Sequence, residues 1–191
     1  MVKCINIDHP TAVNNTINVL KEGGVIVYPT DTIYGFGADA TNDEAIDKIN
    51  RIKKRSGPLS VMGANNKMAF DWMAIDDEQI ERVRSYLGGT QTLIVPVKPD
   101  IVSTKILGED NTLGIRIPDN KFCSKLSVKY GRPIISTSVN RTGDKPLNNP
   151  AKIESEFGSE VNLIIDSGTF PISKSSTIYQ FKNNTVIKLR E

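Results

Sequence analysis

The sequence predicts an α/β fold that is built on a mixed sheet. Segments with helical apolar periodicity alternate along the chain with short apolar runs that are typical of buried strands. A hairpin pattern near residue 183 indicates that at least one pair of strands is antiparallel. The chain has 191 residues and shows no internal repeat and no linker composition, so we expect a single domain over residues 1–191.

The first predicted helix and the first predicted strand follow each other directly. Residues 11–22 carry Val13, Ile17 and Leu20 at the spacing of one helical face, and two glycines end the segment. Residues 25–28 then form a continuous apolar run, which is the pattern of a strand buried on both sides.

The second helix is predicted from its start. Thr41 and Glu44 have the spacing of a capping box, and the apolar periodicity after them extends to about Lys53. Residues 59–62 are apolar enough for the next strand. A third helix over 76–87 is acidic at its start and basic later, which suits the helix dipole.

The remaining elements continue this alternation. The apolar patterns predict strands at 92–97, 113–117, 133–136 and 161–165, and helices at 119–130 and 151–157. We expect a loop over 100–109. Strands at 176–181 and 185–189 flank Asn183 and Asn184, a pair that tolerates positive φ and suits a hairpin turn.

Composition excludes several classes of function. The formal net charge is +2, from 24 basic and 22 acidic residues. This charge is too small to indicate a nucleic-acid binder. The two cysteines are far apart and form no CxxC pair, as expected in a reducing compartment. No apolar run resembles a signal peptide or a membrane span, so we expect a soluble cytoplasmic protein without a membrane partner.

The single histidine, His9, limits the chemistry further. It precedes a proline in a predicted loop, and we expect it on the surface. A Ser-His-Asp or Cys-His nucleophile requires an imidazole base, and a histidine-rich metal site requires several. We therefore predict neither of them, and no metal ligands from the protein.

Four polar segments are candidates for binding a ligand. Residues 28–37 place two threonines and Asp31 directly after a buried strand, where open α/β sheets bind their ligands. The alternative is a turn in which Asp31 and Thr32 only cap backbone groups. Lys53 and Arg55 could clamp phosphates, or could complement a helix dipole. The third is the hydroxyl-rich segment 135–143, whose alternative is an ordinary Ser/Thr turn. The fourth is the segment 174–177, which is paired with Arg190.

Arg116 is unusual because it lies between two isoleucines in a predicted strand. Alternation places it on the opposite face from Ile115 and Ile117, where it either points to solvent or contacts an anion. The chain contains no GxxxxGK[ST] loop and no GxGxxG motif. These residues alone thus predict an anion or nucleotide binder of unspecified kind.

As an ordered set, these segments resemble the YrdC-like family of threonylcarbamoyl-AMP synthases. The resemblance extends from about residue 10 to residue 190. Any one motif is weak, whereas the order and spacing of the whole set are specific. The matching segments are Tyr-Pro-Thr-Asp-Thr-Ile-Tyr-Gly-Phe-Gly at 28–37, Lys-x-Arg at 53–55, Pro-Leu at 58–59, Gly-Ile-Arg-Ile-Pro at 114–118, Ser-x-Asn at 138–140 and Ser-Thr at 176–177.

The resemblance implies a fold and a reaction. The fold is an open, twisted, mixed sheet with flanking helices around a large basic cavity. The reaction joins bicarbonate to the amine of L-threonine and adenylates the carbamate with ATP, releasing pyrophosphate. A tRNA-modifying threonylcarbamoyl transferase complex then takes up the product. Mg²⁺ is expected on the phosphates, held mainly by phosphate oxygens and water.

The resemblance also implies roles for ten residues. Lys53, Arg55, Ser138 and Asn140 match the catalytic and phosphate-binding positions, and Thr112 and Arg190 match further nucleotide-binding positions. The positions expected to bind L-threonine are Thr32, Arg116, Ser136 and Ser176.

The chain departs from the family pattern at two places near this site. Ser56 and Gly57 form a shorter spacer than usual before Pro58, and Met62 stands where many relatives have a histidine. Two alternative functions remain. One is an RNA-binding module of the same fold, which would contact tRNA or double-stranded RNA. The other is a paralogous enzyme that forms another carbamoyl-type adenylate.

Overall fold

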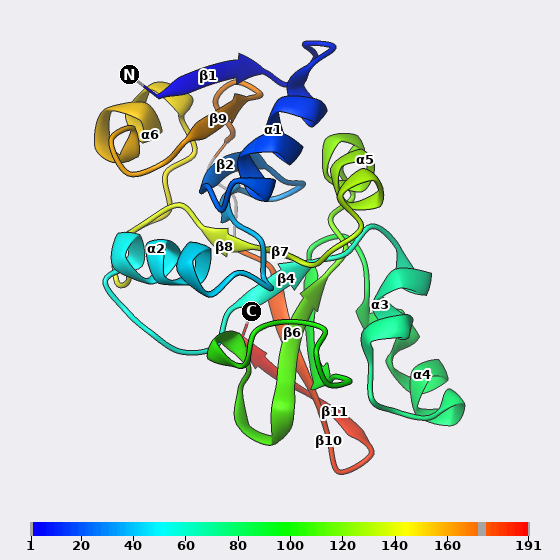
Figure 1. Ribbon diagram of the computed structural model, residues 1–191. Coiled ribbons are helices and arrows are strands. Elements are labelled where there is room, and N and C mark those ends of the chain that lie inside the picture. The colour runs from blue at the N-terminus through cyan, green and yellow to red at the C-terminus, as the bar shows by residue number, and fades with distance from the viewer. Residues whose placement is uncertain (1, 172–174, 191) are drawn as a thin grey trace.

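The computed structural model describes residues 2–171 and 175–190, and it contains two mixed sheets with flanking helices (Figure 1). The first sheet has the order β1-β9-β2-β3-β8. Its strands are β1 (Lys3–Asn6), β9 (Leu163–Asp166), β2 (Ile26–Pro29), β3 (Tyr34–Gly37) and β8 (Thr137–Ser138). β1 and β2 pair with β9 in parallel, whereas β3 pairs antiparallel with both β2 and β8.

The second sheet has the order β11-β10-β5-β6-β4-β7. Only two of its pairings are parallel, those of β10 with β5 and of β4 with β6. Its strands are β11 (Thr185–Arg190), β10 (Thr177–Lys182), β5 (Gln91–Pro96), β6 (Thr112–Arg116), β4 (Ser60–Met62) and β7 (Ile134–Ile135). The mixed α/β class is therefore confirmed, although the strands divide between two sheets rather than forming one.

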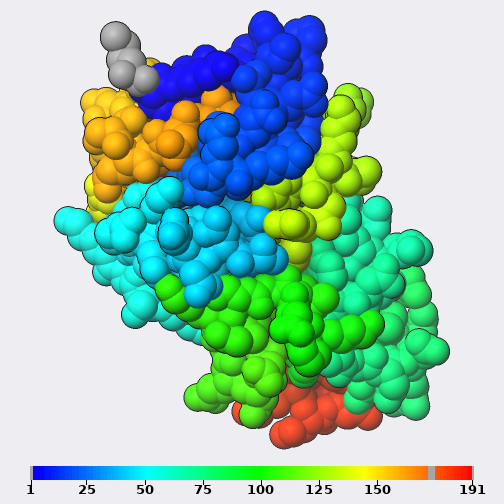
Figure 2. All heavy atoms as spheres, in the orientation of Figure 1, coloured from blue at the N-terminus to red at the C-terminus, as the bar shows by residue number. Residues whose placement is uncertain are grey.

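Helices surround the sheets. α1 and α6 accompany the first sheet, and α3 and α4 lie beside the second sheet (Figure 1). They are α1 (Ala12–Lys21), α2 (Asp43–Lys53), α3 (Asn66–Trp72), α4 (Asp77–Val83), α5 (Lys121–Tyr130) and α6 (Pro150–Phe157), with 3₁₀ turns at Arg84–Tyr86, Thr104–Ile106 and Glu109–Asn111. The segment around residue 160 lies beside the N-terminal strand at one end of the molecule, and the C-terminal hairpin lies at the other end (Figure 2).

Two apolar clusters hold this arrangement together. The larger one joins both sheets, because Phe36 of β3 and Ile115 of β6 belong to it and are fully buried. The smaller cluster packs α1 and α5 together and includes Leu20, Leu126 and Met62. The side chain at Met62 is therefore a core residue here, with an exposed fraction of 0%.

Four predicted details proved wrong or incomplete. The capping box at Thr41 and Glu44 does not form; the N-cap of α2 is Asn42, whose side chain accepts from the Ala45 N–H. The helix predicted over 76–87 ends at Val83 and continues only as a 3₁₀ turn. The strand predicted over 161–165 begins at Leu163, and the loop predicted over 100–109 contains a 3₁₀ turn.

Two other predictions are confirmed. β10 and β11 form the hairpin, with Asn183 and Asn184 in its turn at φ values of 50° and 61°. Side-chain amides tolerate this left-handed region better than most residues do. His9 is exposed, and its ring nitrogen lies 2.9 Å from the Thr11 hydroxyl.

Candidate active site

A cavity of about 580 Å³ collects nearly all of the residues that the sequence singled out. Its wall includes residues of β3 from the first sheet and of β5, β6, β10 and β11 from the second sheet. Thr32 does not line the cavity, but its hydroxyl accepts a hydrogen bond from a residue that does. The nine predicted residues in the wall are Lys53, Arg55, Thr112, Arg116, Ser136, Ser138, Asn140, Ser176 and Arg190.

The described wall carries an excess of positive charge. Lys53, Arg55, Arg116 and Arg190 line it, and Glu109 is the acidic residue among the described lining residues. Low-dielectric walls concentrate the field of such charges, so the cavity attracts anions.

Lys53 is buried at the end of α2, with an exposed fraction of 3%. Its ammonium donates to the backbone oxygens of Ser138 at 2.7 Å and Asn140 at 3.0 Å, and to the Asn140 side-chain oxygen at 3.3 Å. These three acceptors match the three protons of a lysine ammonium. Burial, and secondarily the positive charge of Arg55, lowers the pKa of Lys53 to about 8.

The Ser-x-Asn segment is held by the same network. The Ser138 hydroxyl donates to the Asn140 Oδ1 atom, which also accepts from Lys53. The Asn140 Nδ2 group donates to the backbone oxygens of Arg141 at 2.7 Å and Asp144 at 2.8 Å. Asn140 is therefore engaged on both sides of its amide, and it fixes the loop that follows β8.

Arg55 differs from Lys53 because most of its hydrogen-bonding capacity is available. It is exposed, and its guanidinium donates to the Pro58 carbonyl oxygen at 2.7 Å. A guanidinium has five N–H donors in a planar fork. Arg55 can therefore contact phosphate oxygens directly while it keeps this bond. The spacer between Arg55 and Pro58 turns at Gly57, whose φ of +118° favours glycine.

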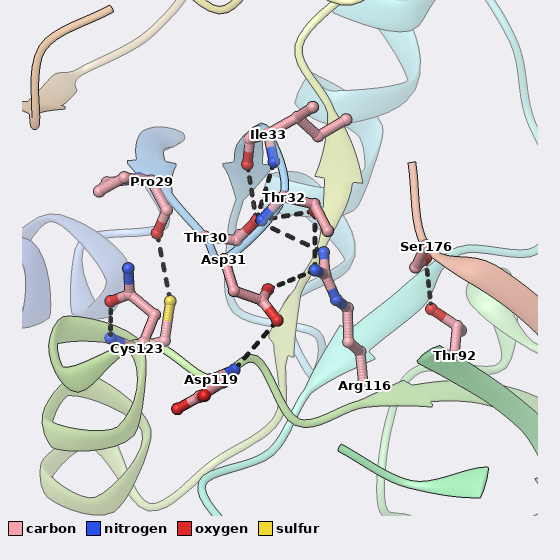
Figure 3. Close-up of polar contacts among 11 residues, drawn as sticks. Pro29, Thr30, Asp31, Thr32, Ile33, Thr92, Arg116, Asp119, Cys123 and Ser176 are labelled. Carbon is pink, nitrogen blue, oxygen red and sulfur yellow. Dashed lines mark hydrogen bonds and ion pairs between the residues drawn. The ribbon is translucent and has the colours of Figure 1, made fainter. Parts of the chain in front are cut away.

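Arg116 leaves β6 and points toward the turn between β2 and β3 (Figure 3). Its Nη2 atom donates to Asp31 Oδ1 and, at 2.7 Å, to the Thr32 hydroxyl, and its Nη1 atom lies 3.5 Å from the Thr30 hydroxyl. The other Asp31 oxygen accepts from the Asp119 N–H at 3.2 Å. The sequence left open whether Arg116 points to solvent or to an anion, and the structure shows it buried against a carboxylate.

The Arg116 guanidinium still has unused capacity. Its side chain is 7% exposed, and its Nε atom is buried without a hydrogen-bond partner among the described residues. An unsatisfied buried donor is costly, so such a group indicates a place for an acceptor.

The remaining predicted residues line the wall around these centres. The Ser176 hydroxyl lies 2.7 Å from the Thr92 hydroxyl (Figure 3), and Arg190 donates to the Ser176 carbonyl oxygen at 3.1 Å. The Thr112 hydroxyl donates to the Glu109 carbonyl oxygen, and the Ser136 N–H donates to the Ser60 carbonyl oxygen.

The sequence places Asp31 in a candidate binding segment but does not indicate its pairing with Arg116. Thr92 and Glu109 were missed altogether, because each lies in an ordinary strand or loop sequence with no distinguishing motif. Lys174, from the fourth polar segment, lies outside the described residues.

In the part of the chain that the structure describes, no helix is both long and apolar enough to traverse a bilayer. The same residues contain no group of three His, Cys, Asp or Glu side chains arranged to hold a metal ion.

Comparison with known proteins identifies the class of protein. The Sua5/YciO/YrdC family model, described as "Telomere recombination", matches residues 18–191. The chain therefore belongs to this family.

Individual relatives agree with this assignment. The chain is 29% identical over 177 residues to a threonylcarbamoyl-AMP synthase of Photobacterium profundum, covering 90% of this chain and 95% of that protein. The E. coli YciO structure superimposes with a TM-score of 0.87 at 26% identity, covering 100% of this chain and 95% of that one. P. abyssi Sua5, solved with L-threonine, has a TM-score of 0.87 at 24% identity; this chain is fully covered and spans 57% of that chain.

Proposed function

We propose that this protein is an L-threonylcarbamoyladenylate synthase acting in the cytoplasm on L-threonine, bicarbonate and ATP. The observation that carries the proposal is the cavity, which combines an available guanidinium at Arg55 with the partly unsatisfied guanidinium of Arg116. The Arg55 guanidinium suits a polyphosphate, and the Arg116 guanidinium suits a carboxylate. Relatives named threonylcarbamoyl-AMP synthase, including the one in Photobacterium profundum, support the choice of reaction.

The chemistry needs no protein nucleophile. A bond forms between the L-threonine nitrogen and the carbon of bicarbonate, and water leaves. A carbamate oxygen then attacks the α-phosphorus of ATP, and the bond to pyrophosphate breaks. Negative charge develops on the α-phosphate and on the leaving pyrophosphate, so fixed cations and hydrogen-bond donors supply the catalysis.

In the proposed reaction, each charged residue of the wall has its own role in binding the substrates or stabilising the developing negative charge. Arg55 contacts the departing phosphates, and Arg190 adds positive charge on the nucleotide side. Lys53 contributes its charge while its ammonium holds the loop of Ser138 and Asn140. The Arg116 guanidinium receives the L-threonine carboxylate at its unsatisfied edge.

Mg²⁺ would neutralise part of the phosphate charge. Glu109 is the one carboxylate among the described lining residues, so the wall suits an ion held by phosphate oxygens and water rather than by a protein cage. We further propose that the product passes to a tRNA-modifying threonylcarbamoyl transferase complex.

The test is pyrophosphate release from ATP and bicarbonate with L-threonine, with L-serine, or with no amino acid. We expect release that requires L-threonine, together with a product that has the mass of threonylcarbamoyl-AMP. Release with another carbamoyl-type substrate alone would support a paralogous enzyme. RNA binding that weakens with salt, without ATP turnover, would support an RNA-binding module.

A further inference from the structure

We propose that Asp31 is a positioning and specificity residue that makes the amino-acid end of the cavity electrically neutral. Asp31 and Arg116 form a buried ion pair, with side-chain exposed fractions of 10% and 7%. Arg116 lines the cavity, whereas Asp31 is not among the lining residues. The identification of the ligand as L-threonine rests on the proposed function.

The geometry around Asp31 fixes the direction of the Arg116 guanidinium. Asp31 uses one oxygen for Arg116 and the other for the Asp119 N–H, so it links the turn after β2 with the segment after β6 (Figure 3). Hydroxyls of Thr30 and Thr32 surround the same guanidinium. The Nε atom is left as a buried donor without a partner among the described residues, so the guanidinium keeps capacity for one more acceptor.

The charge of the pair decides which acceptor is favoured. A lone buried guanidinium would be an uncompensated cation and would bind any small anion, phosphate included. Paired with Asp31 it has no net charge, so it can donate to the carboxylate of a zwitterion without attracting a polyanion. The other cations in the described wall, Lys53, Arg55 and Arg190, have no such buried carboxylate in contact.

Asp31 therefore gives the two ends of one cavity different net charges. The end at Arg116 is neutral and suits the zwitterionic amino acid, whereas the other end is cationic and suits the polyphosphate. Without Asp31, both ends would be cationic, and phosphate groups would compete with the amino acid for Arg116. Specificity of this kind depends as much on weakening the wrong ligand as on binding the right one.

The test compares Asp31→Asn with Asp119→Asn. Asp119 is the matched control because it is adjacent and acidic, and only its backbone N–H contacts the pair. For Asp31→Asn we expect the KM for L-threonine to rise about tenfold or more, which corresponds to about 1.4 kcal/mol, with the KM for ATP unchanged. Inorganic phosphate should become a competitive inhibitor against L-threonine in this variant alone.

A binding measurement separates this inference from the proposed function. Inorganic phosphate is titrated calorimetrically into each protein saturated with ATP. We expect Asp31→Asn to gain a phosphate site that the wild type and Asp119→Asn lack, even if no L-threonine-dependent turnover exists. An absence of this site, or equal effects in both variants, would overturn the inference.

Loss of the carboxylate could unfold the protein, because it leaves Arg116 unpaired. In that case the double variant Asp31→Asn with Arg116→Gln removes both charges. It should bind no additional phosphate and should show a raised KM for L-threonine, whereas a wild-type KM would refute the role of the pair.

Discussion

Replacement of Arg55 by alanine should separate catalysis from stability. The guanidinium is exposed and makes a 2.7 Å hydrogen bond to the Pro58 carbonyl oxygen. Water can take over this bond in the variant, since both groups lie at the surface. The net contribution of such a bond is about 0.5–1.5 kcal/mol, so the free energy of unfolding should fall by no more than this.

The effect on the reaction should be much larger. Arg55 lines the cavity, is exposed and keeps several uncommitted donors, and we place the departing pyrophosphate beside it. Removal of one preorganised donor to developing negative charge typically costs about 10²–10³ in rate. We therefore expect kcat for pyrophosphate release to fall by about that factor, equivalent to about 3–4 kcal/mol.

The assay is L-threonine-dependent pyrophosphate release, combined with urea unfolding of the same preparation. Arg51→Ala is the matched control, because it removes the same charge from an exposed position of α2 that does not line the cavity. Unfolding of Arg55→Ala, near-normal turnover, or an equal loss in Arg51→Ala would each refute the reasoning.

Two further predictions test the phosphate end and the core. The lowered pKa of Lys53 means that its ammonium loses its proton as the pH rises through about 8, so the KM for ATP should rise there in the wild type. Lys53→Met should have a higher KM for ATP at all pH values, without a rise near pH 8. A rise near pH 8 in this variant would exclude Lys53 as the titrating group. In Gly37→Ala the new Cβ would lie 2.8 Å from Cε1 of the buried Tyr28 ring, which should destabilise the fold by about 1–3 kcal/mol. An unchanged urea midpoint would contradict this.

Local pattern predicted most helices, because one buried face imposes a period that survives in the sequence. α1, α5 and α6 coincide with predicted helices to within about two residues. β1 was missed because it is short and mostly exposed, and β3 because its two glycines are rare in strands.

The pairing of strands could not be predicted from local pattern. β9 joins β1 and β2 across more than half of the chain, and β7 pairs with β4 while β8 pairs with β3. β7 and β8 are separated only by Ser136, yet they belong to different sheets. Residue preferences describe a strand but not its partner, so the division into two sheets depends on tertiary packing.

The candidate site was predictable as a set but not in its hydrogen bonding. Order and spacing of motifs grouped nine residues that line one cavity. The sequence does not reveal that Lys53 is occupied by three oxygens of the segment 138–140, or that Arg116 has a carboxylate partner. Both depend on contacts between residues that are about 85 positions apart.

The same contacts explain how the separate parts of the chain that form the cavity are held together. Lys53 ends α2 and bonds to β8 in the first sheet, and Arg116 of β6 in the second sheet bonds to the turn after β2. Each end of the cavity therefore has a cation that joins separate parts of the chain and is largely committed to that task. Because committed donors cannot turn freely toward a ligand, we expect substrate contacts from groups with remaining capacity, which include Arg55, Arg190 and the Arg116 guanidinium.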